Sequence, residues 1–286
     1  MKLVLPRPRR WLLAHGRELE LGARSVVMGI VNATPDSFSD GGAYGGDVEA
    51  ACRAGLRMVE EGADILDIGG ESTRPGGEAV SAQEEQARVL PVIEALAART
   101  SALISIDTYR AETARLAVAA GAHIVNDVWG AQKEPAIARV AAETGAGLCL
   151  MHTGRERERL PDVIEDQRAF LSRSLQIAGK AGVARERIVL DPGFGFAKDV
   201  DENVELMLRM EELQAFGLPI LVGTSRKRFV RALSGRADVR ADAGTAATSV
   251  LLRERGASIF RVHDVVMNRE ALAVADALLA AAGKGA

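Results

Sequence analysis

The chain has few aromatic residues, little net charge and no long hydrophobic run. Aromatic residues make up 4% of its 286 residues, too few for the stacking platforms that bind single-stranded nucleic acid. The formal net charge of −3 gives no general attraction to nucleic acid or to an anionic membrane. No apolar run approaches the ~20 residues that cross a bilayer, and the basic N-terminal segment lacks the apolar stretch of a signal peptide. We therefore expect no nucleic-acid partner and no membrane partner.

Cysteine is also scarce. Cys52 and Cys149 lie in the apolar contexts AACRAG and GLCLMH, and no metal-ligand spacing surrounds them. They read as buried thiols in a reducing compartment, which predicts a cytoplasmic protein. Hydrophobic residues make up 48% and charged residues 26%, as in a globular protein. No linker marks a second domain, so we expect a single domain over residues 1–286.

Short apolar runs alternate with longer amphipathic segments. The runs are nearly continuous in apolar character, as expected of strands buried on both faces. The predicted strands are Val26–Val31, Ile65–Ile68, Leu103–Ile106, His123–Asn126, Gly147–Met151, Ile188–Leu190, Ile220–Val222 and Ser258–Val262. The predicted helices are Val48–Glu61, Ala82–Ala98, Ala111–Ala120, Pro135–Glu143, Asp162–Ala181, Val200–Phe216, Lys227–Leu233, Ala243–Arg255 and Val265–Ala282.

Eight strand–helix units in about 260 residues predict a (β/α)₈ TIM barrel, an α/β fold, over residues 25–283. A doubly wound sheet is the alternative, but no GxGxxG follows the first strand to support a dinucleotide site. Residues 1–24 precede the barrel. There, Trp11–Leu13 and Glu18–Leu21 flank the turn signal His15-Gly16-Arg17, which predicts a short N-terminal β-hairpin. We expect the hairpin to cap the bottom of the barrel.

Polar residues follow the predicted strands, where the active sites of TIM barrels form. The first two strands run into the glycine-rich segments 33–42 and 69–76, which are long for such connections and predict lids over the site. The other strands end in polar groups, namely Asp107, Asn126-Asp127, His152, Asp191, Thr224–Lys227 and Arg261–Asp264.

Each of these groups also has a purely structural interpretation. The acidic residues could cap helices or form turns. The histidines could be satisfied, semi-buried imidazoles, and Arg226 and Lys227 could be solvated residues of a first helical turn. Stability alone does not require all eight strands to deliver polar groups to one rim, which favours a functional site.

The polar groups form two chemical sets. Asp107, Asn126 and Asp191 would suit a flat heterocycle that carries several N–H donors. Some of the cations could hold a phosphate or pyrophosphate, since the end of the eighth strand is a familiar phosphate site. These cations are Arg74, Arg226, Lys227, Arg261 and His263.

The motifs resemble those of the dihydropteroate synthase family. MGIVNATPDSFSDGG at residues 28–42 and DIGGESTRPG at 67–76 resemble the two signatures of that family. The segments IDTYR, NDVWG, LMH, LDPGFGFAKD, GTSRKRF and RVHDV follow in the family's order. The resemblance covers nearly the whole chain, from about Val26 to the last helix.

The resemblance implies a transferase of folate biosynthesis. It would condense 6-hydroxymethyl-7,8-dihydropterin pyrophosphate with p-aminobenzoate to give 7,8-dihydropteroate and pyrophosphate. It also implies Mg²⁺ as cofactor, inhibition by sulfonamides, and a homodimer formed through the late helices.

Site residues are implied as well. The implied catalytic residues are Asp107, Lys227, Arg261 and His263. The implied pterin site consists of Asp107, Asn126, Met151, Asp191 and Lys227. The implied pyrophosphate site consists of Thr73, Arg74, Arg261 and His263. The implied p-aminobenzoate site consists of Phe38, Pro75, Phe196, Ser225 and Lys227, and the implied Mg²⁺ ligand is Asn32.

Two other functions fit parts of the pattern. A pterin-binding methyltransferase domain would share the barrel and the pterin pocket, but it needs neither the RVH of residues 261–263 nor the TPDSFSDGG loop. A non-catalytic pterin-binding protein would be favoured by the loss of Asn32, Lys227 or Arg261, and all three are present.

Overall fold

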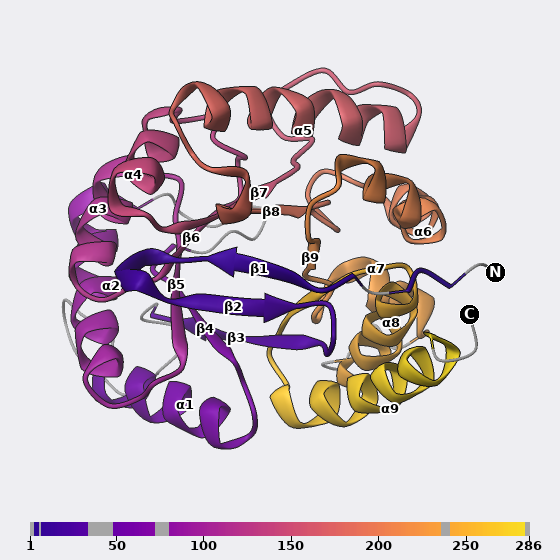
Figure 1. Ribbon diagram of the computed structural model, residues 1–286, viewed down its shortest axis with the longest axis horizontal. Coiled ribbons are helices and arrows are strands. Elements are labelled where there is room, and N and C mark those ends of the chain that lie inside the picture. The colour runs from indigo at the N-terminus through magenta and orange to yellow at the C-terminus, as the bar shows by residue number, and fades with distance from the viewer. Residues whose placement is uncertain (1–2, 6, 34–47, 72–79, 236–240, 284–286) are drawn as a thin grey trace.

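A ring of eight parallel strands forms the centre of the computed structural model, which describes residues 3–5, 7–33, 48–71, 80–235 and 241–283 (Figure 1). The strands are β3 (Val26–Asn32), β4 (Ile65–Gly69), β5 (Leu103–Asp107), β6 (Ile124–Asp127), β7 (Gly147–Met151), β8 (Ile188–Asp191), β9 (Leu221–Val222) and β10 (Ile259–Val262). Their order in the sheet is β8-β7-β6-β5-β4-β3-β10-β9. A bridge between Leu190 and Ile220 joins the two outer strands of this order, β8 and β9. The TIM barrel is therefore confirmed and the doubly wound alternative is wrong.

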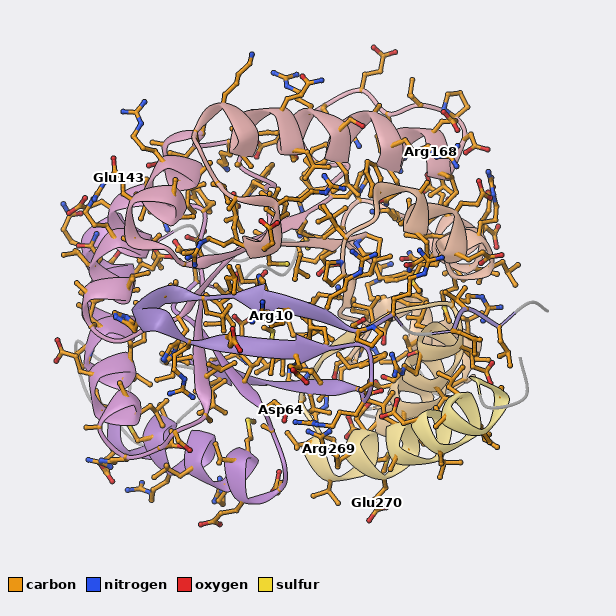
Figure 2. The ribbon with its side chains drawn as sticks, viewed as in Figure 1. Arg10, Asp64, Glu143, Arg168, Arg269 and Glu270 are labelled. Carbon is orange, nitrogen blue, oxygen red and sulfur yellow. The ribbon has the colours of Figure 1, made fainter. Side chains whose placement is uncertain are left out.

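Helices surround the strands on the outside (Figure 1). They are α1 (Val48–Glu60), α2 (Ala82–Ala97), α3 (Ala111–Ala119), α4 (Ala136–Thr144), α5 (Val163–Lys180), α6 (Val200–Arg209), α7 (Arg228–Leu233), α8 (Asp242–Glu254) and α9 (Val265–Gly283). Charged side chains such as Glu143 and Glu270 project outward from this layer (Figure 2). Among the described residues, no helix is long and apolar enough to cross a membrane.

Two kinds of predicted boundary differ from the structure in an informative way. The helix predicted over Val200–Phe216 ends at Arg209 and continues as the 3₁₀ helix η4 (Met210–Phe216). Gly217, with φ of 66°, then stops the helix in the left-handed conformation. Several strands also extend one residue past the apolar run, for instance to Asp107 and Asp191, because the backbone ladder continues whatever the side chain.

The N-terminal hairpin covers one end of the barrel, as predicted. Its strands β1 (Arg9–Leu12) and β2 (Glu18–Leu21) pair antiparallel around the short helix η1 (Ala14–Gly16). Trp11 is buried, and its indole N–H donates to the Arg187 carbonyl oxygen at 2.8 Å. At Gly147 in β7, a Cβ atom would lie 2.5 Å from a methyl carbon of Leu13. The first residue of β7 is therefore a glycine because the hairpin packs directly against it.

Successive inward positions on the strands change from apolar to polar. Strand side chains alternate between the two faces, so residues two apart both point into the barrel. The lower inward residues pack with Trp11 and Leu13 in one apolar cluster, which includes Ile65, Leu103, Ile124, Val189 and Ile259. The next inward residues on the same five strands are polar, namely Asp67, Ser105, Asn126, Asp191 and Arg261. The polar half of the interior lies at the carboxyl ends of the strands, where the predicted site residues gather.

Candidate active site

Arg261 joins several strands in the upper interior. Its Nε atom donates to Oδ2 of Asp67 at 2.6 Å, and its Nη2 atom donates to Oδ2 of Asp107 at 2.7 Å. The Nδ2 atom of Asn126 donates to the same Asp67 oxygen at 3.1 Å. The Arg261 side chain is 21% exposed, whereas Asp67 is fully buried. The structure thus brings two predicted pterin residues, Asp107 and Asn126, together with a predicted pyrophosphate residue.

The charges of this interior are shifted toward neutrality. Burial raises the pKa of Asp107 to about 7, although the Arg261 guanidinium opposes the shift. Burial also raises the pKa of Asp191, against the effect of nearby Lys227. Burial lowers the pKa of Lys227 to about 8, with Asp191 acting in the other direction. Small changes in charge at the site can therefore change the protonation of Asp107 and Lys227 near neutral pH.

Lys227 is held at the start of α7. Its Nζ atom donates to the carbonyl oxygen of Phe194, and it lies 4.6 Å from the centroid of the Phe196 ring. Gly195, with φ of 76°, lets the lysine pass, since a Cβ atom there would lie 2.9 Å from the Lys227 Cδ atom. The preceding Arg226 instead forms an ion pair with an α8 residue, Asp242, at 2.8 Å.

Ser225 and His263 form a second pair on this side of the rim. The Ser225 hydroxyl oxygen accepts from the backbone N–H of His263 at 3.1 Å and lies 2.8 Å from its Nδ1 atom. The hydroxyl has one proton to donate and a second lone pair, so it can pair with Nδ1 in either tautomer of the imidazole. The two contacts to Ser225 fix the orientation of the His263 ring.

Two other predicted residues, Asn32 and Met151, lie on strands next to those already described. Asn32, Gly69, Asp107 and Asn126 are register partners on one continuous rung from β3 to β6. Met151 pairs in register with Asp191 and packs in an apolar cluster that includes Phe196. Other residues of the implied pyrophosphate and p-aminobenzoate sites lie outside the described residues, namely Phe38, Thr73, Arg74 and Pro75.

Three polar residues at the rim do have structural roles. Asp127 accepts hydrogen bonds from the backbone N–H groups of Trp129 and Ala131, at 2.8 and 2.6 Å, and so closes a turn. Asp264 accepts from the N–H of Met267 at 2.9 Å, in the first turn of α9. His152 is buried among three polar partners, Arg157, Asp166 and Lys198, and burial together with the charge of Lys198 lowers its pKa to about 3.

Asp67 is a site residue that the sequence reasoning did not assign. It binds Arg261 and Asn126 through one oxygen, while its other oxygen, Oδ1, has no hydrogen-bond partner within the described structure. Its position two residues beyond inward-facing Ile65 was a usable signal, because strand alternation places it inside the barrel. The metal expectation rests on a single amide oxygen at Asn32. In the described part of the chain, no group of three or more His, Cys, Asp or Glu side chains could hold a metal ion.

Known proteins similar to this chain belong to one enzyme family. Residues 28–263 match the family described as pterin binding enzyme. A dihydropteroate synthase of Bacillus subtilis is 46% identical over 260 residues, which cover 90% of this chain and 89% of the relative. The chain belongs to the dihydropteroate synthase family. Membership confirms the resemblance and the predicted class of enzyme, a transferase of the folate pathway.

Solved structures of the family superimpose closely. The dihydropteroate synthase of Xanthomonas albilineans with 4-aminobenzoic acid has a TM-score of 0.87 at 45% identity, covering 93% of this chain and 97% of that one. The same enzyme in complex with 7,8-dihydropteroate has a TM-score of 0.84 at 43% identity, covering 93% and 98%. The roles of individual residues in this chain stay predictions.

Proposed function

We propose that the chain condenses 6-hydroxymethyl-7,8-dihydropterin pyrophosphate with p-aminobenzoate, giving 7,8-dihydropteroate and pyrophosphate. The observation that carries this proposal is the set of Asp107, Asn126, Asp191, Lys227 and Arg261 in one upper barrel interior. The 4-aminobenzoic acid and 7,8-dihydropteroate bound by the Xanthomonas albilineans relative support the choice of second substrate and product.

The pterin would bind among the acceptors of the interior. Asp107, Asn126 and Asp191 offer carboxylate and amide oxygens to the N–H groups of the ring, and Met151 offers an apolar wall. Asn126 and Asp191 are 3% and 5% exposed, so hydrogen bonds to them would form away from water. Such shielding strengthens each bond and penalises a ring that lacks the matching donor.

The pyrophosphate would bind at the end of β10. Arg261 and His263 supply guanidinium and imidazole N–H donors, and Thr73 and Arg74 are the proposed partners from the segment after β4. In the structure Arg261 neutralises Asp107. When Arg261 binds the leaving pyrophosphate, the Asp107 charge becomes available to the cation that develops on the pterin methylene carbon. Bond cleavage and charge stabilisation would thus be coupled through one guanidinium.

Asn32 would hold Mg²⁺ through its amide oxygen. One neutral oxygen fits this ion, which keeps several waters and commonly takes one or two protein oxygens together with phosphate. When bound, the ion would neutralise charge on the leaving group. The position of Asn32 on the rung of Asp107 and Asn126 supports this assignment.

The amine would attack from the side of Lys227. Phe196, Ser225 and Lys227 form the described part of the proposed p-aminobenzoate site, and Phe38 and Pro75 would complete it. The carbon–oxygen bond to pyrophosphate breaks and leaves the methylene cation, the amine nitrogen then forms the carbon–nitrogen bond, and that nitrogen releases a proton. An aniline needs no strong base for this attack, so the chain would act through positioning and electrostatics.

The test is pyrophosphate release that depends on p-aminobenzoate, measured with a coupled pyrophosphatase. We expect release from wild type and from Lys180→Ala, an exposed lysine at the end of α5. Release without p-aminobenzoate would contradict the proposed condensation. Pterin binding without any release would instead identify a non-catalytic pterin-binding protein.

We further propose a homodimer through the late helices and a cytoplasmic location. Large apolar side chains are exposed along one part of the chain, at Leu251, Val266, Met267, Val274 and Leu278. Val274→Arg should then convert a dimer into a monomer in sedimentation experiments, and an unchanged sedimentation coefficient would contradict this surface. Both cysteines are free and buried, in keeping with a reducing compartment.

A further inference from the structure

The segment between β8 and α6, residues 192–199, makes both described contacts of Lys227 within the site. Its Phe194 carbonyl accepts from the Lys227 ammonium, and its Phe196 ring lies beside that ammonium. Its backbone is bonded from several sides, and the donors to its carbonyl oxygens come from Gly154, Arg159, Gln167, Lys198, Asn203 and Lys227. A loop bonded in this way is a scaffold of fixed shape.

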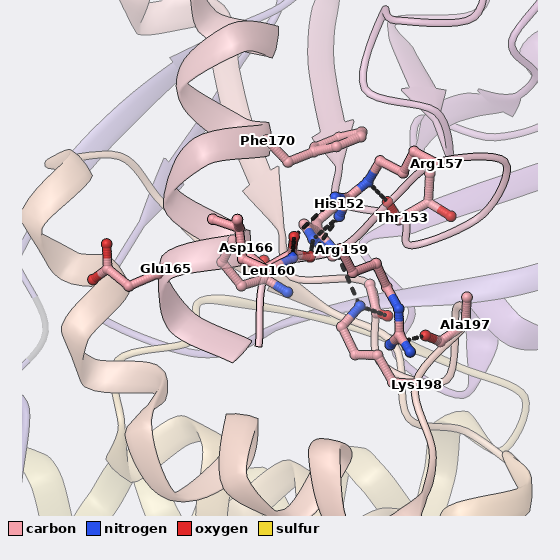
Figure 3. A network of polar contacts seen from close by, with 12 residues as sticks. His152, Thr153, Arg157, Arg159, Leu160, Glu165, Asp166, Phe170, Ala197 and Lys198 are labelled. Atoms are coloured by element: carbon pink, nitrogen blue, oxygen red, sulfur yellow. Dashed lines mark hydrogen bonds and ion pairs between the residues drawn. The ribbon is translucent and has the colours of Figure 1, made fainter. Parts of the chain in front are cut away.

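Lys198 joins this segment to the polar network around His152 (Figure 3). Its Nζ atom is 2.9 Å from Nδ1 of His152, 2.9 Å from the carbonyl oxygen of Gly193 and 3.5 Å from that of Phe196. Burial lowers the pKa of Lys198 to about 7. Three acceptors nevertheless face its Nζ atom, one for each N–H of the ammonium form. The Gly193 and Phe194 carbonyls follow one another in the chain, so one lysine holds the first and Lys227 binds the second.

His152 anchors Lys198 to the body of the barrel. With Nδ1 facing Nζ of Lys198, the other ring nitrogen, Nε2, lies 2.9 Å from Oδ2 of Asp166 and 2.9 Å from Nη2 of Arg157. Arg157 fixes that carboxylate with contacts of 2.5 and 2.8 Å (Figure 3). The chain of contacts runs from Asp166 in α5, through His152 after β7, to the segment after β8.

The segment also crosses His152 at very close range. Gly193 has φ of 64°, and a Cβ atom there would lie 1.9 Å from the His152 carbonyl oxygen. Ala197 keeps a left-handed backbone with φ of 51°, a conformation that a non-glycine residue holds only when its surroundings impose it. The segment is therefore held in place by His152, and Lys198 closes the contact from the other side.

We propose that Lys198 is a positioning residue for the reaction: with His152 behind it, it fixes the segment that places Lys227 and the Phe196 wall of the p-aminobenzoate site. The inference rests on the proposed function for the roles of Lys227 and Phe196. Lys198 contacts the carbonyl oxygens of Gly193 and Phe196 and acts through that backbone. A displacement of about 1 Å at a positioned group can cost roughly 100-fold in rate. A small relaxation of this segment is therefore enough to slow the reaction measurably.

The kinetic test compares Lys198→Met with Lys198→Arg. Methionine keeps the length and removes the donors, whereas arginine keeps a charged donor. We expect Lys198→Met to lower kcat and raise KM for p-aminobenzoate, together roughly 10- to 100-fold in kcat/KM. The affinity for a pterin fragment without phosphate should change little, and Lys198→Arg should recover much of the loss. The matched control is Lys180→Met, which should behave as wild type.

A spectroscopic readout separates positioning from general damage. Nitrogen-15 NMR of histidine should show His152 neutral in the wild type. In Lys198→Met the pKa of His152 should rise, because a nearby positive charge has been removed. Lys198→Gln serves the same purpose if the methionine variant does not fold.

Three results would overturn the proposal. One is a folded Lys198→Met enzyme with wild-type kcat and KM. Another is an equal loss in the methionine and arginine variants with an unchanged His152 spectrum. The third is an equal fall in pterin-fragment affinity, which would indicate damage beyond the segment. If wild type itself releases no pyrophosphate, the proposed function fails, whereas the His152 spectra still report whether Lys198 holds this segment.

Discussion

The lower interior of the barrel is apolar and closed by the hairpin, whereas the upper interior is charged and faces the loops after the strands. On the same strands, Ile65 and Ile259 belong to the lower cluster, and Asp67 and Arg261 follow two residues later. The lower side chains are stabilised by leaving water, roughly 25 cal/mol for each Å² of apolar surface. The upper charged side chains lose the free energy of hydration, and their attraction to one another offsets only part of that loss.

The difference indicates that the lower end of the strands serves mainly stability, whereas the upper end serves the proposed chemistry. The lower end can be optimised for packing alone, because no ligand has to enter there. The upper end keeps charges buried at a cost in stability, and shifted pKa values such as those of Asp107 and Lys227 are the sign of that cost. Changes at the two ends should therefore have effects of different kinds.

The largest effect should come from the lower end. Trp11→Ala should lower the free energy of unfolding by about 3–5 kcal/mol, because it empties a buried site and removes the bond to the Arg187 carbonyl. The kcat of the folded fraction should not change. Urea unfolding and active-site titration measure the two quantities, with exposed Glu20→Ala as control. A loss of kcat per folded molecule would show that the two ends are coupled.

The next largest effect should come from Lys227 at the upper end of the barrel. Lys227→Ala should lower kcat/KM roughly 100- to 1000-fold, the usual consequence of removing one preorganised charged donor. The free energy of unfolding should change little or rise, because burial already disfavours this charge. The coupled pyrophosphate assay and thermal unfolding test both parts. A well-folded variant with near wild-type turnover would remove Lys227 from the site.

A smaller effect, with a defined pH dependence, should come from Asp107→Asn. Losing this carboxylate should raise the barrier by about 1.5–3 kcal/mol, seen in kcat more than in pterin affinity. In the wild type, activity should fall as the pH drops below about 7, where Asp107 takes up a proton, and this limb should be absent in the variant.

The free energy of unfolding should change with pH in the direction opposite to activity. The folded-state pKa of Asp107 lies above its ordinary value of 3.8, so its protonation stabilises the fold at low pH, and this contribution is lost as the pH rises through about 7. Asp107→Asn should flatten that part of the stability curve. Unchanged pH profiles for both activity and unfolding would contradict the charge assigned to Asp107.

The smallest effect should be that of Ser225→Ala. His263 would lose the hydroxyl that orients it, which should weaken pyrophosphate binding by about 0.5–1.5 kcal/mol. Calorimetry with pyrophosphate measures the change. Ser225→Thr keeps the hydroxyl and should bind nearly as wild type does, so equal losses in both variants would exclude this hydrogen bond as the cause.

The sequence by itself determined the secondary-structure elements and which polar residues lie at the ends of the strands. Continuous apolar runs, each followed by a polar residue, place Asp107 and Asn126 at strand ends, because a strand buried on both faces must be apolar until it reaches the rim. The turn signal at His15-Gly16-Arg17 likewise predicts the hairpin from local chemistry alone. These features depend on neighbours in the chain, which a sequence displays directly.

The tertiary structure alone decided which side chains meet. Arg261 reaches Asp107 across 154 positions of sequence and Asp67 across 194. Lys198 meets His152 because β7 and β8 are neighbours in the ring, and Asp264 caps a helix whereas Asp107 pairs with an arginine. Such pairings depend on the register and closure of the barrel. Packing of the whole interior sets that register, and no local run of residues encodes it.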